Sequence, residues 1–227
     1  MCRVRVGLAT LRDKVYVLRL RDKFQTLEDS STVVCIDATG NEVEIESRAL
    51  RRVQKVSTIS CDNEDQQLVI VFPYERSNLG ALIPWTTRTQ ERLPMAMSYL
   101  IQHQETLEQR GHSVRTWFEY GSTQGLETVF GPKILVPPMS RDGRLFLSEF
   151  DDSTIFSGYG IFFSGDLRQL HTRLSQPDFQ RYARQMGRTL RGGWFSMSKT
   201  SISKFALTEP EWKALGAWND PTRPSLL

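Results

Sequence analysis

The sequence predicts an α+β fold: a single mixed sheet with flanking helices and a loosely attached C-terminal tail. Short runs rich in β-branched residues recur along the chain, an amphipathic helical pattern fills its middle, and two more helical patterns come late. These patterns do not alternate in the regular way that βαβ units require, so a parallel α/β fold is not expected.

The expected strands are short and are separated by polar or glycine-containing breaks. The segment Asp-Ala-Thr-Gly-Asn at 37–41 predicts a hairpin turn, and the apolar run at 68–72 stops at Pro73. Gly158 and Gly160 interrupt the last strand. In chain order, the expected strands are residues 4–9, 15–20, 32–37, 43–45, 68–72, 114–118, 133–137 and 155–163.

Apolar residues at helical spacing predict a helix over 92–110, ended by Gly111, and a second helix over 166–174. A third helix is expected over 178–186, where Asp178 follows a proline and is the expected N-cap. These helices supply the apolar faces that would cover the sheet.

Farther along, Ser198 is placed to cap a short helix whose free N–H groups could hold a phosphate. Residues 208–227 contain three prolines and form the expected tail, in which Trp212 and Trp218 would dock on the rest of the chain. The sequence contains no internal repeat and no low-complexity stretch.

The charge of the chain is concentrated rather than large. Its 227 residues are 39% hydrophobic and 24% charged, as is ordinary for a soluble protein, and the net charge is only +3. Arginine supplies 22 of the 29 cations, and a guanidinium can bind phosphate or guanine through two hydrogen bonds, which lysine cannot do. Residues 181–204 hold six cations and no acid around a Gly-Gly-Trp-Phe turn. Such a segment suits contacts with phosphates and base edges, although a solvated helix face would show the same pattern.

Cysteine usage and targeting signals favour a soluble, cytoplasmic protein. Cys2, Cys35 and Cys61 are too few and too scattered for a disulfide framework or a zinc site. The sequence shows no signal peptide, and no apolar run approaches the roughly 20 residues that a membrane span requires. We therefore expect no membrane partner.

Catalytic signatures are nearly absent. The sequence contains no Gly-x-Ser-x-Gly elbow, no P-loop and no dinucleotide-binding glycine motif. His103, His112 and His171 form no metal-spaced cluster, so we expect structural or surface roles for them. One nuclease-like alternative pairs Asp178 with Glu211 at a catalytic metal, but a helix cap explains Asp178 more simply. We expect no catalytic residue and no metal ligand in this chain.

Several motifs follow one another in a fixed order. They are Trp-Phe-Glu-Tyr-Gly-Ser-Thr-Gln-Gly-Leu at 117–126, Lys-Ile-Leu-Val-Pro-x-Met-Ser-Arg at 133–141, Gly-Tyr-Gly at 158–160, and Leu-Arg-Gly-Gly-Trp-Phe-Ser-Met-Ser-Lys at 190–199, with Ile-Ser-Lys-Phe at 202–205. Together they resemble the TaqI-like C-terminal specificity domain of bacterial adenine-specific DNA methyltransferases and of the restriction-modification enzymes fused to them. Further similarity at 6–17, 72–75 and 99–110 extends the resemblance over nearly the whole chain.

The resemblance implies that residues 1–207 form one target recognition domain that reads a short DNA sequence. In that family a catalytic domain binds S-adenosylmethionine and methylates an adenine that is flipped out of the duplex. This chain lacks the cofactor-binding glycine turn and the Asn-Pro-Pro-Tyr-type tetrapeptide of that domain. We therefore expect no methyl transfer by this chain alone. Double-stranded DNA and a methyltransferase domain or subunit would be its partners, and S-adenosylmethionine would bind to that methyltransferase.

Ten residues are candidates for the DNA face. Three are expected to contact bases, three to anchor phosphates, and one aromatic either stacks on a base or packs in the core. The expected base contacts are Gln124, Arg141 and Arg191, the phosphate anchors are Lys14, Arg188 and Lys199, the aromatic is Trp194, and the other candidates are Arg12, Ser122 and Ser198.

Two rival functions remain open. The first is a small metal-dependent nuclease that uses Asp178 and Glu211. The second is a protein-interaction module or decoy that binds a methyltransferase without reading DNA. RNA binding is less favoured, because the aromatic ladder expected for stacking single strands is missing.

Overall fold

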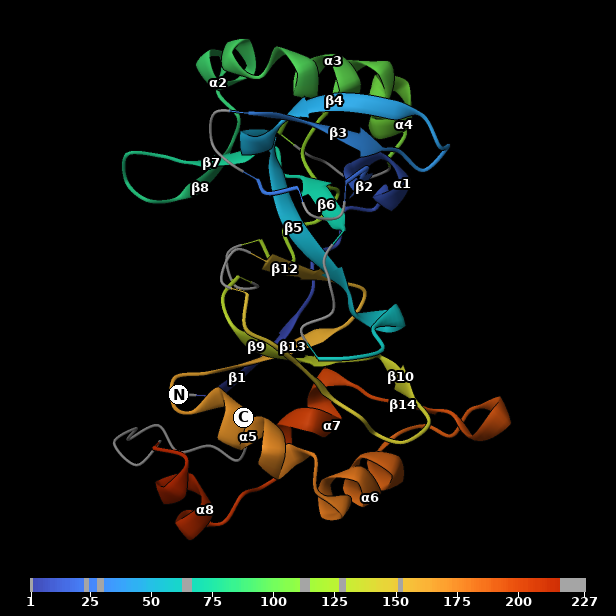
Figure 1. Ribbon diagram of the computed structural model, residues 1–227, viewed down its shortest axis with the longest axis vertical. Coiled ribbons are helices and arrows are strands. Elements are labelled where there is room, and N and C mark those ends of the chain that lie inside the picture. The colour runs from blue at the N-terminus through green and yellow to red at the C-terminus, as the bar shows by residue number, and fades with distance from the viewer. Residues whose placement is uncertain are drawn as a thin grey trace.

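Two sheets divide the chain into an upper and a lower lobe (Figure 1). The computed structural model describes residues 2–22, 25–27, 31–62, 67–110, 115–126, 130–150 and 153–216. The upper lobe is built on a six-stranded sheet of order β12-β5-β6-β2-β3-β4, and the lower lobe on a four-stranded sheet of order β1-β13-β9-β11. The α+β class is confirmed, but the expected single sheet is wrong, because the strands are shared between these two sheets and two short ribbons.

Every strand pair of the described residues is antiparallel except β12 with β5, which makes the larger sheet mixed. The upper sheet consists of β2 (Val17–Leu20), β3 (Thr32–Ile36), β4 (Glu42–Glu46), β5 (Leu50–Lys55), β6 (Leu68–Val71) and β12 (Ser153–Phe156). The lower sheet consists of β1 (Cys2–Val6), β9 (Lys133–Val136), β11 (Phe146–Ser148) and β13 (Tyr159–Phe163). The ribbons pair β7 (Tyr74–Arg76) with β8 (Leu82–Pro84), and β10 (Met139–Ser140) with β14 (Phe195–Ser196).

Helices cover the outer end of each lobe (Figure 1). The upper lobe carries α1 (Asp13–Tyr16), α2 (Thr87–Arg92), α3 (Pro94–Gln102) and α4 (Gln104–Glu108). The lower lobe carries α5 (Leu167–Leu174), α6 (Pro177–Met186), α7 (Lys199–Ser203) and α8 (Glu209–Ala214). Single 3₁₀ turns are η1 (Ser47–Ala49), η2 (Val56–Thr58) and η3 (Arg191–Gly193).

Three strand predictions are wrong in part. The segment at 15–20 begins inside helix α1, so that only its second half is extended. Residues 115–118 form bends and turns instead of a strand, and residue 114 lies outside the described ranges. The segment at 155–163 is two strands in different sheets, because Ser157 adopts a φ of 58° and turns the chain from one lobe into the other.

The helix predictions needed two corrections. The pattern over 92–110 is not one helix: α3 and α4 meet at His103, whose φ and ψ of −107° and 8° are not helical. The N-cap of α6 is Gln176, because the Asp178 carboxylate pairs with Arg173 instead of closing the first turn. The capping role of Ser198 is confirmed, since its hydroxyl accepts a hydrogen bond from the Ser201 backbone N–H at 3.0 Å.

Each lobe has its own apolar core. The upper core contains a cluster of buried tyrosines, in which the Tyr120 ring lies 4.8 Å from Tyr16 and 5.2 Å from Tyr74, centroid to centroid. The lower core is formed where α5, α6 and α7 cover the smaller sheet and bury Phe179 and Phe195 almost completely. Burial of these side chains from water is the main force that holds each lobe together.

Backbone hydrogen bonds fix the junction between the lobes. The Gly7 N–H donates to the Gly158 carbonyl at 3.0 Å, and the Leu8 N–H donates to the Ile155 carbonyl at 2.8 Å. Gly7 has no room for a side chain, because a Cβ there would lie 2.8 Å from the carbonyl oxygen of Ile155. The strand β1 therefore leaves the lower sheet at a fixed point.

The first part of the expected tail packs on the lower lobe. A capping box between Thr208 and Glu211 begins α8, the Trp212 ring lies 6.0 Å from that of Phe163, and Leu215 is buried. Trp212 thus docks as expected, whereas Trp218 lies outside the described ranges. Within the part of the chain that the structure describes, no helix is long and apolar enough to cross a membrane.

Candidate nucleic-acid interface

A small hairpin projects from the lower lobe at residues 188–196, which we call the basic hairpin. The Leu190 N–H donates to the Trp194 carbonyl at 2.8 Å, and the Ser196 N–H donates to the Arg188 carbonyl at 2.9 Å. Gly192 and Gly193 form the tip with φ values of 71° and 77°, a conformation that other residues adopt only at a cost. The Gly-Gly pair therefore closes a tight turn between an arm that carries Arg188 and Arg191 and an arm that carries Trp194.

The base of the basic hairpin is anchored while its tip is free. Its strand β14 pairs with β10, and the buried side chains of Phe195 and Met197 hold it in the lower core. Arg188 and Arg191 are exposed, and Trp194 has 39% of its surface exposed. Trp194 is therefore not one of the buried residues of the lower core.

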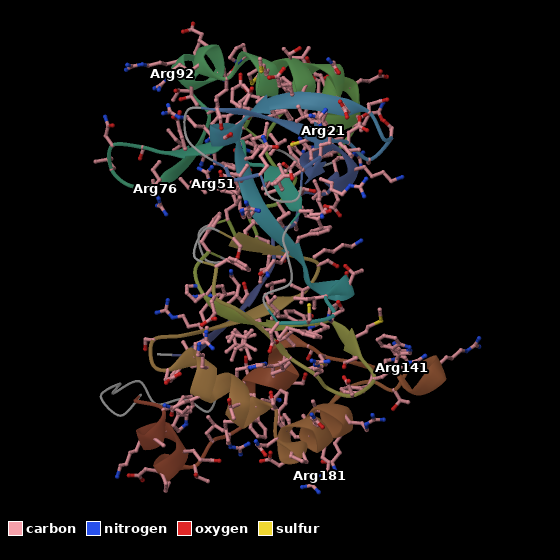
Figure 2. All side chains as sticks on the ribbon, viewed as in Figure 1. Arg21, Arg51, Arg76, Arg92, Arg141 and Arg181 are labelled. Carbon is pink, nitrogen blue, oxygen red and sulfur yellow. The ribbon has the colours of Figure 1, made fainter. Side chains whose placement is uncertain are left out.

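Arg141 stacks on this tryptophan. Its guanidinium carbon lies 5.1 Å from the centroid of the Trp194 ring, a cation–π geometry. Arg141 directly follows β10, the strand that pairs with β14, and Figure 2 places it at the side of the lower lobe. The structure thus brings Arg141, Arg188, Arg191 and Trp194 to one surface.

The acidic side chains near the C-terminal end of the lower lobe have partners other than the cations of residues 181–204. Between residues 158 and 216 the acids Asp178 and Glu211 pair with Arg173, Glu209 pairs with Lys213, and Asp166 caps α5. None of the six cations in 181–204 forms an ion pair with an acidic residue in the described ranges. These cations are Arg181, Arg184, Arg188, Arg191, Lys199 and Lys204. A field of one sign over a small area attracts polyanions.

The close approach of α6 to the basic hairpin leads to a stability prediction. A Cβ on Gly187 would overlap the Ser196 carbonyl oxygen and lie 3.0 Å from that of Ala183. Gly187→Ala is expected to push the hairpin away and to lower the free energy of unfolding by about 1–3 kcal/mol. Urea unfolding measures this effect, and Gln185→Ala, on the exposed face of the same helix, should change stability by under about 0.5 kcal/mol. Equal stability of the two variants would contradict the close packing.

Two candidates of the upper lobe are engaged in holding the fold. The Gln124 amide donates to the Gly7 carbonyl at 2.9 Å, and the Arg12 guanidinium donates to the Thr106 carbonyl at 3.0 Å. Ser122 Oγ accepts a hydrogen bond from the Gln124 backbone N–H at 3.2 Å, and Lys14 is exposed on α1. Arg12 and Lys14 belong to the N-cap and first turn of α1, and Gln124 contacts Gly7 at the junction between the lobes. Figure 1 shows α1 in the upper lobe, away from the ribbon of β10 and β14.

Ser198 and Lys199 follow the basic hairpin directly along the chain. The Ser198 hydroxyl is engaged in the capping box with Ser201. Helix α7 has only five residues, so its dipole attracts a phosphate only weakly. Lys199 is exposed at the start of α7. Of this pair, Lys199 is the residue that remains free for a partner.

Sequence reasoning missed two arginines of the same surface. Arg181 and Arg184 on α6 are exposed, and their i, i+3 spacing puts them on one face of the helix. That periodicity was the available signal. Figure 2 places Arg181 at the lower end of this lobe.

The two carboxylates of the nuclease alternative meet at one arginine. Arg173 donates to Asp178 Oδ1 at 3.0 Å and Oδ2 at 2.7 Å, and its Nε donates to Glu211 Oε1 at 2.5 Å. A metal would have to displace this guanidinium to bind both groups. No cluster of three or more histidine, cysteine or acidic side chains suited to a metal occurs among the residues that the structure describes.

This ion pair network predicts how stability depends on pH. Hydrogen bonds from Arg173 hold the pKa of Asp178 below its ordinary value of 3.8, and those from Thr208 and Arg173 hold the pKa of Glu211 below 4.5. Because both values are lowered by folding, the stabilisation is complete above roughly pH 5 and is lost as the pH falls through the folded values. Urea unfolding between pH 3 and 6 should show this loss, and Asp178→Asn combined with Glu211→Gln should flatten it. An unchanged pH profile in that double variant would contradict the assignment.

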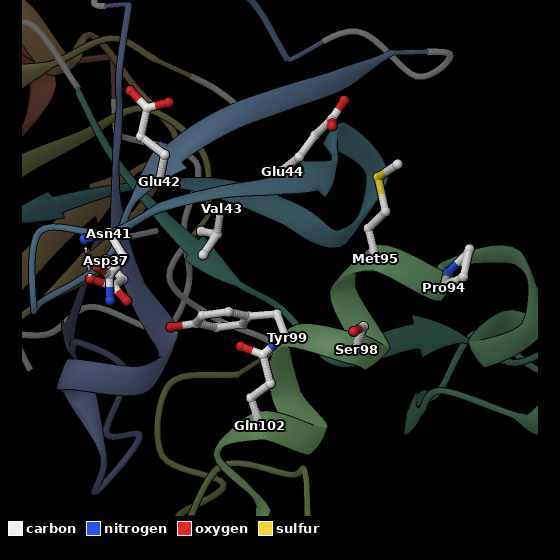
Figure 3. A pocket seen from close by; sticks show the side chains of 10 residues that line it. All are labelled: Asp37, Asn41, Glu42, Val43, Glu44, Pro94, Met95, Ser98, Tyr99 and Gln102. Atoms are coloured by element: carbon white, nitrogen blue, oxygen red, sulfur yellow. Dashed lines mark hydrogen bonds between the residues drawn. The ribbon is translucent and has the colours of Figure 1, made fainter.

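A hollow lies between β4 and α3 of the upper lobe (Figure 3). It has a volume of about 460 Å³. The charged side chains that line it are all acidic, namely Asp37, Glu42 and Glu44. Because DNA is a polyanion, this hollow does not suit it.

Comparison with known proteins gives a likeness in fold. No protein-family model matches the sequence, and no curated protein is significantly similar to it. Among solved structures, the fold is similar to part of MmeI, a Type IIL restriction-modification enzyme whose structure was determined in complex with DNA. The TM-score is 0.59 and the sequence identity 13%, over 100% of this chain and 29% of the MmeI chain. The likeness is one of fold with part of this enzyme, and it does not single out the TaqI-like family.

Proposed function

We propose that this chain recognises a short sequence in double-stranded DNA as the specificity module of a restriction-modification system. The observation that carries the proposal is the basic hairpin, whose exposed cations form no ion pair within the described residues and whose Trp194 stacks on Arg141. The likeness in fold to part of a restriction-modification enzyme in complex with DNA supports it. Cations position the module on phosphates, and side chains of the same surface read bases.

The form of the basic hairpin suits base reading. A two-stranded ribbon fits the major groove, where an arginine can bind the O6 and N7 atoms of guanine together. The anchored base, through Phe195, limits the loss of conformational entropy on binding, and the glycine tip allows close approach to the duplex. Arg191 at the tip is the base reader of the proposal, and Arg188 at the base anchors a phosphate.

The finer part of the proposal concerns the partner. The order of motifs between residues 117 and 205, which resembles the TaqI-like specificity domains, supports an adenine-specific methyltransferase as the partner. We place the chemistry, and S-adenosylmethionine, in that partner, because this sequence has no motif for binding the cofactor or for holding a flipped adenine.

Selection from a random duplex pool, followed by fluorescence anisotropy on the selected and scrambled duplexes, tests the proposal. The chain should enrich one short motif and bind it more tightly than scrambled DNA. Cleavage of a plasmid by the pure chain with magnesium would instead support the nuclease. Binding of a methyltransferase without any affinity for duplex at low salt would support the protein-interaction module.

Lys199→Ala is expected to weaken the binding of selected and scrambled duplexes alike. Because one exposed cation would no longer neutralise a phosphate, the slope of log K against log salt should flatten by about one unit. Anisotropy titrations over a range of salt concentrations measure the slope. Lys213→Ala is the matched control, since that ammonium pairs with Glu209 at 3.3 Å on α8. The same slope in both variants and in the parent would rule out a phosphate contact at Lys199.

A further inference from the structure

A second basic feature lies beside the basic hairpin, in a pocket between α6 and the loop that follows β10. We call it the α6 pocket. It has a volume of about 330 Å³ and is lined by Arg141, Asp142, Pro177, Gln180, Arg181 and Arg184. The loop packs closely on the helix, because a Cβ on Gly143 would lie 3.3 Å from the Cα of Gln180. The walls of the pocket are therefore fixed relative to each other.

Contacts within the fold hold two of the three arginines of the α6 pocket in place. Arg184 donates a hydrogen bond to the Arg141 carbonyl, and its guanidinium carbon lies 5.1 Å from the centroid of the Phe195 ring. Arg141 is held by its stack on Trp194. Arg181 is exposed and makes no side-chain hydrogen bond or ion pair with any residue that the structure describes. Two cations are thus oriented in advance, and the third is free to close on a ligand.

The one carboxylate of the α6 pocket is tied into the loop. Asp142 Oδ1 accepts hydrogen bonds from the Ser140 hydroxyl at 3.0 Å and the Arg144 N–H at 2.9 Å. Three guanidinium groups face this single carboxylate, so the pocket keeps a positive excess. Its chemistry is that of an anion site.

The lining of the α6 pocket also restricts the kind of anion. The lining residues include no aromatic ring on which a base could stack, and Pro177 is the one apolar residue among them. The volume corresponds to on the order of ten water molecules, which is enough for a phosphate group with part of its hydration shell. Guanidinium groups bind phosphate oxygens through paired hydrogen bonds.

We propose that the α6 pocket binds a backbone phosphate of the DNA strand that runs past the basic hairpin. Arg141 joins the two features, because it lines the pocket and stacks on Trp194. The inference rests on the proposed function, since the phosphate is that of the recognised duplex. The pocket fixes the position of the duplex, while the hairpin tip reads the sequence.

Arg181→Gln tests the proposal, with Arg168→Gln as a matched control. Arg168 is also an exposed arginine on a helix of the lower lobe, but it pairs with Glu149. Anisotropy titrations should show that Arg181→Gln binds selected and scrambled duplexes more weakly by the same factor, with a salt slope flatter by about one unit. Arg168→Gln should behave as the parent, and thermal unfolding should confirm that both variants fold.

A chemical probe locates the phosphate. Duplexes that carry one neutral methylphosphonate are scanned along the selected site, and one position should weaken binding to the parent but not to Arg181→Gln. If the parent binds DNA and Arg181→Gln binds it with the same affinity and the same salt slope, the α6 pocket does not bind a phosphate. The proposed function would remain intact. A loss of sequence preference in that variant would also overturn the proposal for the α6 pocket, because Arg181 would then read a base.

Competition with inorganic phosphate is a third test of the proposal. Its titration into the parent, at an ionic strength matched with chloride, should compete with duplex binding and should lose that effect in Arg181→Gln. If the parent binds phosphate but Arg181→Gln does not change DNA binding, the α6 pocket is a site for free anions. That result would overturn the proposal that the pocket binds a phosphate of DNA. A parent that binds no duplex at low salt would overturn the proposed function itself.

Discussion

Replacing Arg110 by methionine should lower the free energy of unfolding by about 3–5 kcal/mol. Arg110 is only 6% exposed and donates to the carbonyls of Leu107 at 2.6 Å, Trp117 at 2.6 Å and Glu119 at 2.5 Å. Methionine fills similar space but donates nothing, so three partly or fully buried carbonyls would lose their charged donor. Each such loss costs about 1–3 kcal/mol.

The same arginine supports a buried phenol. Arg110 donates to Tyr16 Oη at 3.1 Å, and that hydroxyl in turn donates to the carbonyls of Phe118 and Glu119, both at 3.0 Å. Burial raises the pKa of Tyr16 to about 12, even though the neighbouring Arg110 charge acts in the opposite direction. The hydroxyl therefore stays protonated and donates at any ordinary pH.

Urea unfolding of Arg110→Met against Arg88→Met gives the measurement. Arg88 is exposed on α2, so its replacement should change stability by under about 0.5 kcal/mol. Arg110→Lys should fall between the two, because one ammonium cannot reach all the acceptors that the planar guanidinium serves. A loss below 1 kcal/mol in Arg110→Met would mean that water replaces the guanidinium at no great cost.

Arg191→Ala should relax sequence preference more than any other single change in the basic hairpin. If Arg191 binds a base through two hydrogen bonds, the loss of discrimination is about 1–3 kcal/mol, or roughly 5- to 150-fold in the ratio of affinities. Its position at the exposed tip, beside two glycines, gives it the freedom to reach a base edge. Anisotropy on the selected and scrambled duplexes provides the ratio.

Arg188→Ala is the control for that prediction. It removes the same side chain from the base of the same hairpin, and Arg188 is exposed as well. As a phosphate anchor, Arg188 should affect both duplexes equally and leave the ratio unchanged. If the ratio of affinities for selected and scrambled duplexes falls in Arg188→Ala but not in Arg191→Ala, Arg188 is the base reader and Arg191 the phosphate anchor. If the ratio is unchanged in both variants, another part of the chain reads the bases.

The parts of the site that could be predicted from the sequence are local. The Ser198 cap, the Gly-Gly turn and the run of cations without acids each depend on neighbouring residues, and the structure places them as expected. The upper-lobe candidates depend on distant partners: Gln124 bonds to Gly7, 117 residues away. No local pattern reveals that an exposed-looking amide is already paired across the fold.

The same limit explains the errors in the fold. A helical pattern over 92–110 does not show that the chain bends at His103, where the Tyr99 hydroxyl ties α3 to the Val15 carbonyl at 2.7 Å. The division into two sheets depends on the pairing of β12 with β5 and of β13 with β1, which join distant segments of the sequence. Strand runs could be predicted, but their partners could not.

The pairing of β1 with β13 has a consequence for synthesis of the protein. The first strand, Cys2–Val6, has its neighbour at Tyr159–Phe163, so it leaves the ribosome long before that neighbour exists. At about 5–20 residues per second the wait is on the order of ten seconds, during which a strand edge with apolar residues is unprotected. The upper lobe can begin to collapse in that interval, whereas the surface proposed to bind DNA assembles only after residues 141–199 have emerged.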